Sequence, residues 1–333
     1  MKSTGKGLRP IVLLSAVALA SLAAGFTASH YLFPNVASPD NSAECVKKYS
    51  LLRGDIDCTS VNDDYERVNK IQDDLNAYID QQKTDGNVTR VSIFFRDLSS
   101  RRWAAVNKDE KYAPGSMLKV VIAIAYYKLA EVEPQILSQE YIYNPTAKSM
   151  NDIETFKPKD PLIPGKSYTV KELITHTIID SDNETATLLS NSIDKSFLDK
   201  VFSDLGILLP TTGGGEENFL GVETYSGILR TLYLAAYLNA NNSQEVLSLM
   251  TKASFPEGIT NGVSDDVPVA HKFGERKVID PKTGAEETAE LHDCGIIYKT
   301  NHPYILCIMT EGTTYDHLAN VLTGISKIVF QNE

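Results

Sequence analysis

Residues 114–125 read PGSMLKVVIAIA and carry the strongest structural signal in the chain. The stretch is apolar nearly all round, which predicts a buried helix from Ser116 to about Glu131. Lys119 is the only charge in that helix before Lys128. A buried lysine is costly unless it is paired or loses its proton. Because Lys119 follows Ser116 by three residues, the two share a helix face, where a desolvated lysine can take a proton from a hydroxyl.

The segments on either side of this helix predict the fold. Apolar residues at helical spacing predict one helix at 62–85 and another at 315–330. We expect a mostly helical block at 108–255 and strands at 88–98, 102–107, 267–273, 291–298 and 304–309. The pattern predicts an α/β (α+β) fold, a five-stranded antiparallel sheet flanked by N- and C-terminal helices, with an inserted all-helical lobe.

Two further motifs carry candidate chemistry. The triplet SDN at 181–183 opens a predicted helix, and a plain helix cap is its alternative interpretation. The sequence HKFG at 271–274 ends a predicted strand, where Lys272 can bind a substrate carboxylate and Gly274 lets a substrate backbone approach. An edge-strand lysine before a turn is the alternative there. An incidental serine and a snorkelling lysine are the alternative for Ser116 and Lys119.

The order and spacing of the three motifs are more specific than each motif by itself. The SDN triplet begins 65 residues after Ser116, and Lys272 follows Ser181 by 91 residues. Over about residues 62–330 this pattern resembles the class A β-lactamase-like branch of the penicillin-recognising serine hydrolases. The resemblance implies no metal and no organic cofactor.

The resemblance also implies a role for each motif residue. Ser116 would be the acylated nucleophile, Lys119 its proton acceptor, and Ser181 the relay of a proton to the leaving nitrogen. Asn183 would hold the substrate's side-chain amide, and Lys272 would attract the substrate carboxylate. The oxyanion hole would consist of two backbone N–H groups, those of Ser116 and Glu275.

The sequence departs from the family pattern at two points. Phe273 occupies a position that usually carries Thr or Ser, so a hydroxyl contact to the substrate is missing. Class A β-lactamases also have a Glu-x-x-Leu-Asn loop whose Glu activates the hydrolytic water. The near match here is ENFLG at 217–221, in which Gly221 replaces the Asn and a helix resumes at once. Glu217 is therefore either a deacylating base or a solvated charge, and we expect slow deacylation.

The N-terminal segment predicts the cellular location of the protein. Three basic residues precede an uncharged run from Ile11 to Phe33, which is longer than the ~20 residues that span a bilayer. We predict a signal anchor at 1–33, with a cleaved signal or a buried soluble helix as alternatives, a linker at 34–60 and a hydrolase domain at 61–333. The domain would face outward from the cell membrane. An oxidising compartment would let Cys45 pair with Cys58.

Two later cysteines raise a separate question. Cys294 and Cys307 lie directly opposite each other if a tight turn is centred between Thr300 and Asn301. Two cysteines that face each other across neighbouring strands can form a disulfide or can pack as two free thiols.

The net charge of the chain bears on its class of binding partner. The net charge of -11, from 32 basic and 43 acidic residues, disfavours nucleic-acid binding. Together, the family resemblance and the N-terminal segment imply a membrane-anchored serine hydrolase that acts on a small-molecule β-lactam. The alternatives are a D,D-peptidase acting on peptidoglycan peptides and a sensor domain that binds such ligands without hydrolysis.

Overall fold

The centre of the fold is a five-stranded antiparallel sheet with strand order β2-β1-β7-β6-β5. The computed structural model describes residues 61–145, 149–210, 217–279 and 286–333. The strands are β1 (Arg90–Asp97), β2 (Trp103–Val106), β5 (Val269–Ile279), β6 (Glu286–Ile297) and β7 (Tyr304–Gly312). The predicted sheet is therefore confirmed. β5, β6 and β7 extend beyond the expected strands at 267–273, 291–298 and 304–309.

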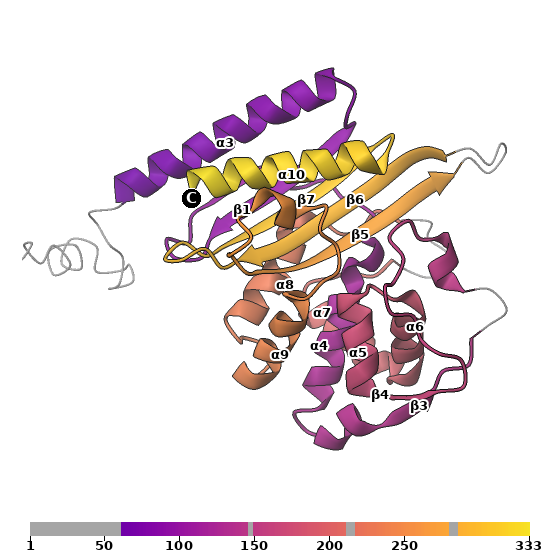
Figure 1. Cartoon of the computed structure of the whole chain (residues 1–333). Helices are drawn as coiled ribbons and strands as arrows, with labels where there is room; N and C mark the ends of the chain where they lie inside the picture. Colours follow the sequence, from indigo (N-terminus) through magenta and orange to yellow (C-terminus); the bar gives the residue numbers. More distant parts are fainter. Residues whose placement is uncertain (1–60, 146–148, 211–216, 280–285) are drawn as a thin grey trace, which may run out of the picture. The chain divides into compact units, whose positions relative to one another are not determined.

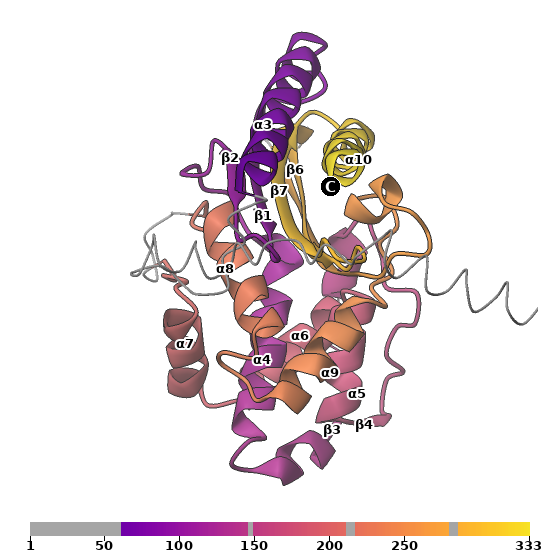
Figure 2. The ribbon, with the colours of Figure 1, turned by 90° about the vertical axis from the view of Figure 1, so that its left-hand side faces the viewer.

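The two faces of the sheet carry different layers. Helices α3 (Val61–Thr84) and α10 (Tyr315–Asn332) lie on one face, and the helical lobe lies on the other (Figures 1 and 2). Alternation along β7 sorts its side chains, because Leu306 and Ile308 join the core under α3 and α10, whereas Cys307 and Met309 join the core of the lobe. The predicted terminal helices and inserted lobe are both confirmed.

The lobe contains six α-helices among the described residues. They are α4 (Lys119–Leu129), α5 (Val170–Ile179), α6 (Asn183–Ser192), α7 (Lys195–Asp204), α8 (Val222–Tyr233) and α9 (Ala240–Met250). Short 3-10 turns occur at η1 (Gly115–Leu118), η2 (Pro134–Ser138), η3 (Met150–Ile153) and η4 (Ile259–Gly262). A small two-stranded antiparallel sheet, which the sequence did not predict, consists of β3 (Glu140–Ile142) and β4 (Ser167–Thr169).

The hairpin of β6 and β7 shows which of the two alternatives holds for Cys294 and Cys307. β6 and β7 place Cys294 directly opposite Cys307, and the two are joined by a disulfide bond. Asn301 has a φ of 65°, so a left-handed residue lies in the connection, as a tight turn requires. Cys45 and Cys58 lie outside the described residues.

Residues 64–333 form one compact unit. Among the described residues, each helix is too short or too polar to cross a lipid bilayer. The anchor predicted at 1–33 and the linker predicted at 34–60 lie outside the described residues.

Candidate active site

The turn that carries Ser116 packs tightly against strand β5. Gly115 has a φ of +50°, and a Cβ there would lie 2.7 Å from the carbonyl oxygen of Glu275 and 3.2 Å from its amide nitrogen. A Cβ at Gly274 would lie 2.5 Å from the Pro114 carbonyl oxygen. Two glycines thus let the turn and the strand touch. The turn therefore packs directly beside Gly274, and the expected role of this glycine in substrate approach stays a prediction.

The helix expected from Ser116 begins instead as the 3-10 turn η1, and regular α-helix starts at Lys119. Ser116 is 8% exposed and Lys119 is 5% exposed. The Lys119 ammonium donates to the Ser116 hydroxyl oxygen over 2.7 Å. The structure therefore joins the first motif as a hydrogen-bonded pair at the buried start of α4.

The second motif lies against the same lysine. Lys119 Nζ donates to Asn183 Oδ1 at 2.6 Å and to the Ser181 backbone carbonyl oxygen, and it lies 3.3 Å from Ser181 Oγ. Burial lowers the pKa of Lys119 to about 8, although the charges of Glu154, Asp182 and Glu275 oppose that shift. A lysine with this pKa loses its proton far more readily than an exposed one.

Local hydrogen bonds hold the SDN triplet in place. Asp182 caps helix α6, and its Oδ1 accepts from the backbone N–H groups of Glu184 at 2.7 Å and Thr185 at 3.1 Å. The helix-cap interpretation is therefore correct for the central residue of the motif. Ser181 has a φ of 56°, a strained conformation for a residue with a side chain, so the packing around it sets its direction.

The third motif completes the cluster. The Lys272 ammonium is fully buried and donates to Ser181 Oγ at 2.7 Å and to the Phe273 carbonyl oxygen at 3.0 Å. Burial and the nearby Lys119 charge lower the pKa of Lys272 well below its usual value. Phe273 stacks on Phe255 with ring centroids 4.2 Å apart, and Lys272 Nζ lies 4.2 Å from the Phe273 ring centroid. The residue that replaces the usual hydroxyl is thus part of an aromatic core.

The structure places Glu217 away from this cluster. Its carboxylate pairs with Arg276, and its side chain is 66% exposed. Among the described residues, Glu217 forms no hydrogen bond or ion pair with Ser116 or Lys119. Within that part of the chain, the site therefore lacks a carboxylate from the position where the sequence offered one.

Two carboxylate side chains, to which the sequence assigned no role, are linked to the cluster; of Glu275 it singled out only the backbone N–H. Asn183 Nδ2 donates to Glu154 Oε1 at 2.6 Å. The Glu275 side chain is buried, contacts the Glu154 carboxyl and accepts from the backbone N–H groups of Thr155 at 3.1 Å and Phe156 at 2.9 Å. These bonds tie the segment after η3 to β5. Burial and the Glu275 carboxyl raise the pKa of Glu154.

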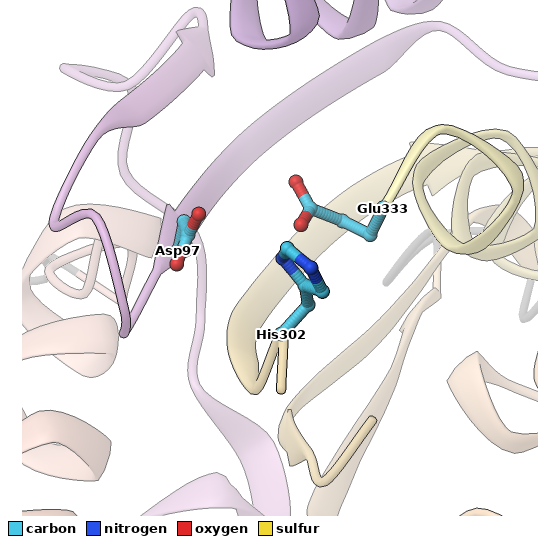
Figure 3. Close-up of side chains that lie close together, drawn as sticks. All are labelled: Asp97, His302 and Glu333. Atoms are coloured by element: carbon cyan, nitrogen blue, oxygen red, sulfur yellow. The ribbon is translucent and has the colours of Figure 1, made fainter. Parts of the chain in front are cut away.

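One group of described residues has the side chains of a metal site. Ligand atoms of Asp97, His302 and Glu333 all lie within 4.8 Å of one another. Figure 3 shows the Glu333 carboxylate and the His302 ring pointing toward each other. Arg67, however, pairs with both carboxylates, and Asp97 also accepts from Ser99 and Ser100. We interpret the group as an ion-pair network that links α3 and the end of α10 to the last residue of β1.

Comparison with known proteins agrees with this geometry. The sequence model of the β-lactamase enzyme family matches residues 70–332, and the chain belongs to that family. It is thus a serine β-lactamase-like enzyme by family and fold. A search of curated proteins finds no match.

Solved structures show the same fold at low sequence identity. A β-lactamase from Xanthomonas campestris is 20% identical with a TM-score of 0.65, covering 79% of this chain and 98% of its own. An ancestral class A β-lactamase is 18% identical with a TM-score of 0.63, covering 77% and 99%. A mutant of PBP-A, solved as an acyl-enzyme complex with penicillin G, is 16% identical with a TM-score of 0.61, covering 77% and 94%.

Proposed function

We propose that this protein is a serine hydrolase that forms an acyl-enzyme through Ser116 with β-lactams and hydrolyses that ester slowly. The observation that carries the proposal is the continuous set of hydrogen bonds from Ser116 through Lys119 to Ser181 and Lys272. A domain that only bound ligands would have no need of two buried lysines around a serine pair, and this disfavours the sensor alternative.

The proposed acylation uses each contact in turn. Neutral Lys119 takes the proton from Ser116 Oγ while that oxygen attacks the lactam carbonyl carbon. The carbon–nitrogen bond breaks, and Ser181 passes a proton to the leaving nitrogen. The backbone N–H groups of Ser116 and Glu275 would stabilise the negative charge on the carbonyl oxygen. Lys272 holds the substrate carboxylate, and Asn183 holds the side-chain amide.

The position of Glu217 favours slow hydrolysis and also supports a second candidate function. An ester to Ser116 is hydrolysed when a base deprotonates a water beside it. Glu217 is exposed and paired with Arg276, so it is poorly placed for that task. A D,D-peptidase that acts on peptidoglycan peptides uses the same acylation machinery and is inhibited by β-lactams that leave it slowly.

Labelling with a fluorescent penicillin tests the proposal. We expect Ser116→Ala to abolish covalent labelling, because the attacking oxygen is irreplaceable, and Ser181→Ala to retain part of it, because water can replace a relay. Undiminished labelling of Ser116→Ala would place the nucleophile elsewhere. Release of D-alanine from a peptide ending in D-alanyl-D-alanine, absent in Ser116→Ala, would identify the peptidase.

We also propose that residues 1–33 anchor the enzyme in the cell membrane with its hydrolase domain outside. The uncharged run after three basic residues supports the anchor. The Cys294–Cys307 disulfide supports an oxidising compartment. Fractionation of cells tests this proposal, and a soluble mature protein that starts near residue 30 would overturn it.

A further inference from the structure

Glu154 lies beside the proposed catalytic cluster although it belongs to none of the three motifs. It follows the 3-10 turn η3, in the segment between α4 and α5. Its carboxylate accepts from Asn183 Nδ2 at 2.6 Å, while Asn183 Oδ1 accepts from Lys119 Nζ at 2.6 Å. The Asn183 amide is thus held between one carboxylate and one ammonium group. An amide with both ends engaged cannot flip without losing a charge-assisted hydrogen bond.

We propose that Glu154 is a positioning residue of the Ser116 site, which holds Asn183 against Lys119 and supplies negative charge beside the lysine. The inference rests on the proposed function, in which Lys119 is the base. It deepens that function, because the carboxylate next to the lysine comes from the segment before the SDN motif and not from the loop that contains Glu217.

The charged groups around Lys119 set the direction of the effect. Glu154 faces it from the segment after η3, Asp182 from the start of α6, and Glu275 and Lys272 from β5. Of the three carboxylates that raise the pKa of Lys119, Glu154 has the largest effect. Removing its charge therefore lowers the lysine pKa further, even though Asp182 and Glu275 remain.

The anchoring of Glu154 makes this arrangement persistent. Backbone N–H groups of Thr155 and Phe156 donate to the buried Glu275 carboxylate, so the two residues after Glu154 are fixed to β5. On the other side, Asn151 Oδ1 accepts from the Asn183 backbone N–H at 2.8 Å. Contacts on both flanks hold the carboxylate in place before any substrate arrives, as a positioning role requires.

The substitution Glu154→Gln isolates the charge. Glutamine keeps an oxygen that accepts from Asn183, and its amide group can donate to Glu275. The experiment measures the rate constant of acylation by a fluorescent penicillin between pH 5.5 and 9.5 in the full-length protein. In the parent enzyme we expect the rate to rise with pH as Lys119 loses its proton, through a pKa of about 8. In Glu154→Gln we expect this rise in the acylation rate to occur about one pH unit lower.

Two further variants separate positioning from general effects. Glu217→Gln removes the same charge from an exposed carboxylate and should leave the pH at which the acylation rate rises unchanged. Glu154→Ala also removes the hydrogen-bond acceptor, so we expect the plateau rate to fall at least about tenfold in addition to the shift, because Asn183 is released. A pH profile of acylation that is unchanged in Glu154→Gln, or that shifts equally in Glu217→Gln, would overturn the proposal.

A substrate-free measurement keeps this inference distinct from the proposed function. An NMR titration of the Lys119 ε-methylene, assigned by its loss in Lys119→Met, reports the lysine pKa directly. A lower pKa in Glu154→Gln with no acylation by any penicillin would support the placement of Glu154 and refute the proposed function. An unchanged pKa together with normal acylation would refute the role of Glu154 and leave the proposed function standing.

Discussion

Gly274→Ala should damage both the stability and the acylation rate of the enzyme. The new Cβ would lie 2.5 Å from the Pro114 carbonyl oxygen and 2.9 Å from Met117 Cγ. Ordinary contact requires about 3.4 Å or more, so the turn that carries Ser116 must move by roughly 1 Å. Overpacking of this kind costs about 1–3 kcal/mol. A nucleophile misplaced by about 1 Å can lose about 100-fold in rate.

Thermal unfolding and penicillin acylation measure the two effects. We expect Tm to fall by about 2–10 °C and the acylation rate constant to fall by about 100-fold. Gly227→Ala is the matched control, because a Cβ at that helical glycine meets no atom within 4 Å. It should leave both quantities unchanged or raise Tm slightly. A Gly274→Ala enzyme with the parent Tm and a reduced rate would refute the packing argument and favour a direct role of Gly274 in substrate approach.

The remaining predictions concern the buried lysine, a buried histidine and the disulfide. Lys119→Met should fold, because a buried charge is removed, but acylate at least about 100-fold more slowly by stopped flow; near-parent rates would exclude Lys119 as the base. Burial lowers the pKa of His292 to about 4. Between about pH 6.5 and pH 4 the unfolded chain therefore binds a proton at His292 that the folded chain does not bind. The free energy of unfolding should fall by about 3 kcal/mol over that range. Denaturant unfolding should show a shallower pH dependence in His292→Gln, and identical slopes would contradict this. Reduction of Cys294–Cys307, which closes a loop of sequence separation 13, should cost about 3 kcal/mol, and an equal effect of reductant on the Cys294→Ala, Cys307→Ala double variant would refute it.

The sequence predicted the sheet and the cysteine register because strand periodicity and turn position are local properties. Alternation along 304–309 assigns each side chain to a face, and a turn at Thr300 and Asn301 fixes which residues face each other. The family resemblance also implies that the three motifs meet. In the structure, hydrogen bonds link the Ser116–Lys119 pair to Ser181, and Ser181 to Lys272.

The sequence could not reveal the position of Glu154 or the packing of the Ser116 turn against Gly274. The segment around Glu154 has no helical or strand period, and hydrogen bonds to Glu275, more than a hundred residues later, decide its position. A strand pattern likewise does not show that the turn at Pro114 packs against Gly274. The 3-10 start at Gly115 arises from that same packing between η1 and β5.

The central claim is that Ser116 forms an ester with β-lactams that persists. The most direct test follows the intact mass of the purified protein after mixing with a penicillin. We predict a rapid gain of one penicillin mass that persists for many minutes, is absent in Ser116→Ala and is unchanged in Glu217→Gln. An adduct that never forms, or one that clears within seconds in the parent and accumulates only in Glu217→Gln, would refute slow hydrolysis of a Ser116 ester.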